Sequence, residues 1–150
     1  MASGNRNQGT NNNIIYVTKI DAATEPVSVN NISCTLNDTL DASDLATVVL
    51  YFNPSSPTVG GSFLGSTSAA FASGHAYSIV INNNVAAGAS GYYVIAVNVN
   101  SDATDNNTVK IDGLTDPVVL GFTTTPNINN NQADLAGTQT IQASDITLTN

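Results

Sequence analysis

The chain has 150 residues, which suits one domain with a sizeable core. Charged residues make up only 9% of the chain, against about a quarter in typical domains, and the formal net charge is −8 with three Lys and Arg in total. This composition argues against nucleic-acid binding, because phosphate contacts need clustered cations, and an anionic membrane surface would repel the chain. No run of residues approaches the ~18–20 apolar positions of a membrane span.

Polarity is carried mainly by Asn, Ser, Thr and Asp, which favour turns, strand faces and extracellular surfaces over helices. Glu25 is the only Glu among the eleven acidic residues, which further argues against helix. No intrachain disulfide can form, because Cys34 is the only cysteine. Residues 1–13 show no apolar leader segment, and we expect an extracellular or cell-surface protein from which a signal peptide has been removed.

The N-terminal region divides into a polar tail over residues 1–13 and a short apolar strand over residues 14–20. Simple alternation would place Ile14, Tyr16 and Ile20 on one face of this strand, and Ile15 and Val17 on the other. A strand with two apolar faces can be donated to a neighbouring copy and buried there on both sides. It can also be the ordinary first strand of its own domain. If the strand is donated to a neighbouring copy, the predicted subunit-interface residues are Ile14, Ile15, Tyr16, Val17 and Ile20.

The rest of the chain is a series of short apolar segments separated by turn-forming residues. We predict strands over 27–36, 45–52, 76–82, 92–100, 108–112, 117–123 and 138–148. The alternation of "YYVIAVNVN" places Tyr93, Ile95, Val97 and Val99 on one face of a strand and Tyr92, Val94, Ala96 and Asn98 on the other. "LATVVLYF" is apolar on both faces at its centre and suits a central strand. The pattern predicts an all-β fold, a two-sheet antiparallel β-sandwich of Ig-like or jelly-roll-like type with about eight strands, as one domain over 14–150.

Two local features accompany the strands. Residues 41–48 and 131–137 could each form a single helical turn, the first capped by Asp41 or Ser43. In "NNISCTLN" the apolar residues alternate with polar ones, which places Cys34 in the core as a small hydrophobic residue.

Residues that could support catalysis are scarce. His75 is the only histidine and lies in a predicted turn. There is no nucleophile elbow, no Gly-rich phosphate loop and no Cys/His metal spacing. We therefore expect no catalytic residues and no enzyme activity.

Two Asp-rich loops offer oxygen ligands of the kind that calcium prefers. Residues 38–44 hold three Asp at three-residue spacing, and residues 100–106 hold two Asp beside two Asn. Neither loop matches the Asp-x-Asp-x-Asp-Gly pattern, and short carboxylates in turns also cap backbone N–H groups. Calcium at these loops is the one cofactor we retain, with no firm metal ligand assigned.

Several segments together resemble a known module. "LDASDLATVVLYF", "FLGSTSAAF", "GHAYSIVIN" and "GYYVIAVNVNSDATDNNTVKIDGL" are similar to the N-terminal β-sandwich module that precedes the repeats of secreted bacterial sialidase-type (BNR-repeat) proteins. The resemblance covers about residues 14–115. The positions that carry it are Asp44, Leu45, Val48, Tyr51, Phe63, Gly65, Gly91, Tyr93 and Val94. It implies a secreted accessory module without catalytic residues of its own.

Two functions follow as hypotheses. The first is a non-enzymatic extracellular structural protein, a homo-oligomeric sandwich subunit that assembles into a filament or surface layer by N-terminal strand exchange. The alternative is an accessory or carbohydrate-binding module of a secreted glycosidase-type protein. Carbohydrate binding stays open, although there is no Trp and all five Tyr fall in predicted strands.

Overall fold

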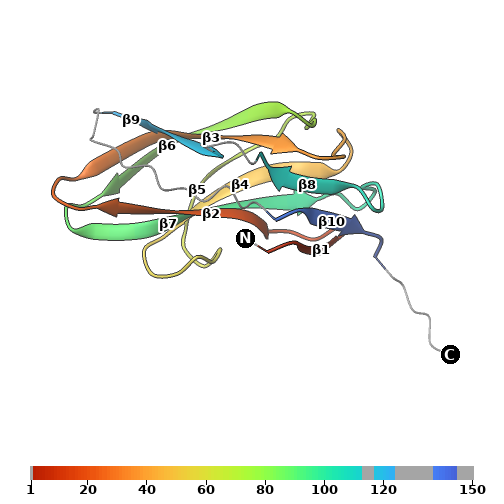
Figure 1. The fold of residues 1–150 in the computed structure, drawn as a ribbon, viewed down its shortest axis with the longest axis horizontal. Helices are drawn as coiled ribbons and strands as arrows, with labels where there is room; N and C mark the ends of the chain where they lie inside the picture. Colours follow the sequence, from red (N-terminus) through yellow and green to blue (C-terminus); the bar gives the residue numbers. More distant parts are fainter. Residues whose placement is uncertain (1, 113–116, 124–136, 145–150) are drawn as a thin grey trace.

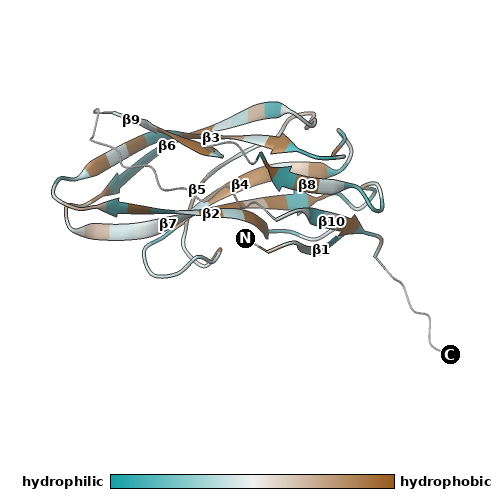
Figure 2. Ribbon diagram, in the orientation of Figure 1, coloured by the Kyte–Doolittle hydropathy of each residue, from teal (hydrophilic) through white to brown (hydrophobic). Residues whose placement is uncertain are grey.

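A computed structural model describes residues 2–112, 117–123 and 137–144 of the chain. Within these residues there are ten strands in two sheets and no helix, so the predicted all-β, two-sheet sandwich is confirmed (Figure 1). Apolar residues fall mainly on the strands, and the connecting loops are polar (Figure 2). The two sheets face one another across a single core.

The smaller sheet has four antiparallel strands, in the order β2 (Asn13–Ala22), β7 (Ala89–Val99), β4 (Leu45–Asn53) and β5 (Ser62–Thr67). β7 and β4 are the central strands. Both are apolar on the two faces, as expected for strands whose inner face meets the core and whose outer face is shielded by neighbours. β2 and β5 are the outermost strands of this sheet.

The larger sheet contains six strands. Its order is β1 (Gly4–Asn7), β10 (Gln139–Gln142), β8 (Thr108–Ile111), β3 (Val27–Asn37) and β6 (His75–Val85), and β9 (Val118–Phe122) also pairs with β3. β8 and β9 follow one another along the same side of β3, with Ile111 opposite Leu36 and Val118 opposite Cys34. β1 and β10 are parallel, and the other strand pairs described in this sheet are antiparallel.

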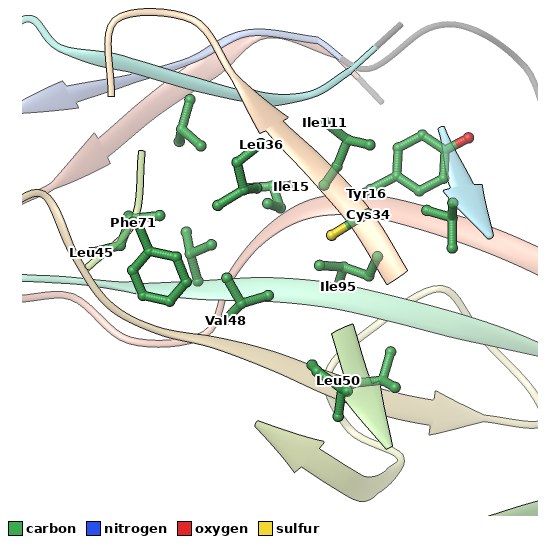
Figure 3. Packing of buried hydrophobic residues seen from close by; sticks show 14 of the residues in the cluster. Ile15, Tyr16, Cys34, Leu36, Leu45, Val48, Leu50, Phe71, Ile95 and Ile111 are labelled. Carbon is green, nitrogen blue, oxygen red and sulfur yellow. The ribbon is translucent and has the colours of Figure 1, made fainter. Parts of the chain in front are cut away.

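The core lies between the inner faces of the two sheets. Leu36 and Ile111 of the large sheet meet Ile15, Val48 and Ile95 of the small sheet across this space (Figure 3). Full burial of each such side chain contributes roughly 1.5–3 kcal/mol, so the core is the main source of stability.

Sequence patterning missed two strands. β1 was expected to be part of a polar tail, because Gly-Asn-Arg-Asn carries no strand signal of its own. β5 was not expected because it is short and contains Gly65. In addition, the single helical turn predicted over residues 41–48 is a hydrogen-bonded turn at residues 42–44, and β4 starts directly after it. The Asp41 side chain caps this turn by accepting from the Ser43 N–H, as predicted. Residues 131–136 and 145–148, where the second helical turn and the end of the last strand were predicted, lie outside the described residues.

Cys34 faces the core, as its position in the alternating pattern predicted. Burial raises the pKa of its thiol to about 12, so the reactive thiolate is scarce in the folded state at neutral pH.

We expect the Cys34 thiol of the native protein to resist alkylation at neutral and mildly alkaline pH. A thiol reagent with mass-spectrometric readout measures this, and labelling in denaturant is the positive control. Rapid labelling of the folded protein would show that the strand phase around Cys34 is wrong.

Candidate functional site

The predicted assembly strand forms part of β2 and pairs with β7 of its own chain. A register shift between Ile14 and Tyr16 marks a β-bulge, and the two consecutive residues Ile15 and Tyr16 are both buried, at 0% and 4% exposure. A bulge inserts one extra residue and resets the alternation of the strand. The expectation that Ile15 and Tyr16 lie on opposite faces is therefore wrong, and two successive large residues enter one core.

The five residues predicted at a subunit interface divide between two surfaces. Ile15 and Tyr16 belong to the core, and Ile20 packs against its margin. Ile14 and Val17 are half-buried, and their cross-strand partners on β7 are Ala96 and Val94, which lie on the outer face of the small sheet.

This division can be tested with a matched pair of truncations. Ile15→Ala removes fully buried volume and should lower the free energy of unfolding by ~2–5 kcal/mol. Val17→Ala removes half-exposed surface and should cost about 1 kcal/mol or less. Denaturant unfolding of both variants gives the two values, and equal losses would contradict the bulged register.

The first 22 residues have a special place in the topology. We call residues 2–22 the N-terminal arm; it contains β1 and β2. β1 is the outermost strand of the large sheet and β2 is an outermost strand of the small one, and they lie near each other on one side of the sandwich (Figure 1). A single terminal segment thus supplies an edge strand to each sheet. Among the described residues its strand partners are β10 and β7.

Hydrogen bonds hold the two strands of the arm together and against the rest of the domain. The Arg6 guanidinium donates from Nη2 on β1 to the Ile14 carbonyl on β2, at 3.3 Å, and so connects the two sheets. Between these strands, the Gln8 N–H donates to Gln142, and the Thr10 carbonyl accepts from the Val99 N–H, each at 2.9 Å.

Tyr51 adds a contact from the outer face. Its hydroxyl donates to Asn12 Oδ1 at 2.7 Å, and the Asn12 N–H donates to Asn98 Oδ1 at 2.8 Å. Tyr51 is on β4 and Asn12 immediately precedes β2, so the Tyr51 side chain crosses β7, where the outer-face residue Ala96 is fully buried. Asn12 has a φ of 57°, a left-handed conformation that asparagine tolerates better than most residues.

Polar packing beneath the arm is incomplete. The Gln139 side chain is fully buried, and its Nε2 donates to the Ala2 and Gly137 carbonyls at 3.0 and 2.9 Å. Among the described residues, Gln139 Oε1 and Arg6 Nε are buried without a hydrogen-bond partner. An unsatisfied buried polar group costs roughly 1–3 kcal/mol, which weakens the attachment of β1.

The two Asp-rich loops come together around Asp44, which is fully buried. Its Oδ1 accepts from the Thr104 N–H at 2.8 Å, and its Oδ2 accepts from the Asp41 N–H at 2.8 Å and from Asn107 Nδ2 at 2.9 Å. One carboxylate thereby joins the turn before β4 to the loop before β8. This arrangement matches the capping alternative, in which Asp side chains accept backbone N–H bonds.

Asp41 lies at the surface of the same cluster. Hydrogen bonds from the Ser43 hydroxyl and backbone N–H hold the pKa of Asp41 below its ordinary value, with help from Thr104 and Asn107. The ionised Asp41 carboxylate therefore stabilises the folded state above the pKa that Asp41 has in the unfolded chain. This contribution is lost as pH falls through the lowered pKa of the folded state.

The described part of the structure shows no specific metal geometry. In the part of the chain that it describes, no three His, Cys, Asp or Glu side chains are grouped as metal ligands would be. Calcium at the loops 38–44 or 100–106 stays a prediction, which melting curves with calcium and with chelator test.

Removing the buried carboxylate should separate the two loops. Asp44→Ala leaves the Thr104 and Asp41 N–H groups unpaired and should lower the free energy of unfolding by ~2–3 kcal/mol. Asp102→Ala is the control, because Asp102 is exposed in the same region. Chemical unfolding measures the loss of stability in both variants. A loss for Asp44→Ala no larger than that for Asp102→Ala would show that the junction at Asp44 contributes little to the free energy of unfolding.

Comparison with protein families, curated proteins and solved structures found no match. The resemblance to the sialidase-type module therefore stays a prediction. The described residues contain no helix long and apolar enough to cross a membrane. His75 is exposed at the start of β6.

Proposed function

We propose that this protein is a non-enzymatic extracellular structural subunit that assembles head to tail by exchange of its N-terminal arm. One observation carries the proposal: a contiguous terminal segment supplies an outermost strand to each of the two sheets. The arm can leave without separating any other pair of strands. A neighbour's arm would then find the same β7 and β10 edges and make the same contacts.

The energetics of exchange depend on the hinge. Ile15 and Tyr16 would be buried equally well in their own domain or in a neighbour, so the contacts of the arm nearly cancel between the two states. The remaining difference lies in the connection from the arm to β3. Only residues 23–26, which end in Pro26, lead from β2 in one sheet to β3 in the other. Short hinge segments of this kind favour exchange between copies.

Exchange of this type gives an open assembly. Each subunit donates one arm and accepts another at a different surface, so the contact is heterologous and continues until a chain end is reached. A net charge of −8 keeps individual subunits soluble before assembly. The polar, Asn-rich and Lys-poor composition supports an extracellular or cell-surface setting for such a filament.

A covalent lock between β2 and β7 tests the proposal. Lys19 and Tyr92 are opposite one another in these strands, and Cα atoms at that spacing suit a disulfide. In a Cys34→Ser background, we expect Lys19→Cys with Tyr92→Cys, oxidised as a monomer, to abolish fibres in electron micrographs. Oxidation after assembly should instead give a ladder of covalently joined chains on a non-reducing gel.

The control places a disulfide where no exchange is proposed. Ser33 and Ser78 are opposite one another in β3 and β6, so Ser33→Cys with Ser78→Cys should form an intrachain bond and leave assembly unchanged. Fibres that persist in the oxidised β2–β7 variant, or that yield only intrachain disulfides, would rule out arm exchange. Absence of any assembly by the unmodified protein would rule out the structural role itself.

A further inference from the structure

Charge is distributed very unevenly along this chain. From Leu45 to Ser101 there is no Asp, Glu, Lys or Arg, and the three cations and eleven acids all lie before or after this stretch. The stretch contains all of β4, β5, β6 and β7. None of the charges therefore lies on these four strands or on the loops that connect them.

β5 and β6 form one side of the sandwich within this uncharged stretch. β5 is the outermost strand of the small sheet, at the opposite end from β2, and β6 is the outermost strand of the large sheet, at the opposite end from β1. The two strands approach closely at Gly65, where an added Cβ would lie 2.9 Å from Ile79 Cγ2. The absence of a side chain at Gly65 thus lets the two sheets meet on the side opposite the N-terminal arm.

The outer edge of β5 has no strand partner among the described residues and no charge. Its only ladder partner is β4, and no hydrogen bond among the described residues reaches its other side. Edge strands are normally protected by Lys, another charge, Pro, a short length or a β-bulge. β5 has six residues and a bulge between Phe63 and Gly65, but "SFLGST" contains no charged residue and no Pro. By contrast, the outermost strand β2 carries Lys19 and Asp21 as an exposed ion pair.

An aromatic side chain marks the same edge. Phe63 is 60% exposed, and it contacts Tyr51 edge to face at a centroid distance of 6.0 Å. Phe63, Tyr51 and Val94 are opposite one another on neighbouring strands, so they form an apolar row across the outer face of the small sheet. Solvent-exposed aromatic surface at the end of such a row is a feature of interfaces.

We propose that the β5 edge is the docking site for a second copy of this chain, paired antiparallel through β5 of each copy. Two four-stranded sheets then become one continuous sheet, and the two Phe63 side chains are brought to the shared edge. A second copy fits because two chains of charge −8 repel each other unless their uncharged sides meet. A twofold axis at β5 places the charged segments of both copies away from the contact.

This pairing is separate from arm exchange, because it uses the opposite end of the small sheet. Head-to-tail exchange would extend a filament, and β5 pairing would join two subunits laterally. The test accordingly uses the full-length chain with the oxidised Lys19→Cys and Tyr92→Cys lock, in which arm exchange is blocked. Fibre formation by the chain without the disulfide tests arm exchange separately from β5 pairing.

Sedimentation equilibrium of the locked chain measures the pairing. We expect a concentration-dependent dimer whose dissociation constant rises by about tenfold or more with Ser66→Glu or Phe63→Glu, because facing carboxylates would oppose one another across the twofold contact. Ala87→Glu is the control, since it adds the same charge at an exposed position in the turn between β6 and β7. Thermal melts confirm that each variant is folded.

Three results would overturn the proposal. The locked chain could remain monomeric at every concentration. The dimer could be unaffected by both β5 variants, or it could be weakened equally by Ala87→Glu, which would indicate a general charge effect. A locked chain that stays monomeric but is retained by an uncharged polysaccharide, with retention lost in Ser66→Glu, would assign the β5 edge to a glycan instead.

Discussion

The need to cover sheet edges is the constraint on which this structure depends. Two sheets of four and six strands leave outermost strands on both sides of the sandwich, and each exposes backbone groups that tend to pair. On one side the chain's own N-terminal arm provides the final strand of both sheets. On the other side β5 and β6 approach closely at Gly65, and the outer edge of β5 is uncharged. The two sides therefore differ: the N-terminal arm closes one, and the uncharged strands β5 and β6 form the other.

The low charge of the chain matters for these edges, because few charged side chains are available to keep neighbouring molecules apart. Most globular surfaces keep neighbours apart with mixed charges, whereas polar character here comes from Asn, Ser and Thr. Charged side chains are restricted to the arm, the segments around β3 and the loops and strands after β7. One of these charged side chains, Asp44, is buried, and its carboxylate joins two loops through three hydrogen bonds. Such a distribution leaves an uncharged side suited to contacts between identical chains.

The two proposed contacts are geometrically complementary. Arm exchange uses β7 and β10, and β5 pairing uses the far edge of the small sheet, so one subunit could take part in both at once. A heterologous contact extends a chain, and a twofold contact joins chains in pairs. Together they would give paired filaments or a layer from one type of subunit. The incomplete hydrogen bonding around Gln139 and Arg6 fits an arm that is held less firmly than the core strands.

The sequence by itself determined the fold class, most strand positions and the core position of Cys34, because alternation and turn residues are local signals. Only the tertiary structure shows that the four residues of β1 form a strand, because they do so by pairing with β10 from the other end of the chain. It also decided the faces of Ile15 and Tyr16, because a bulge changes the alternation without a distinct residue signature. Likewise, the junction at Asp44 unites segments about sixty residues apart, and no local pattern records that contact.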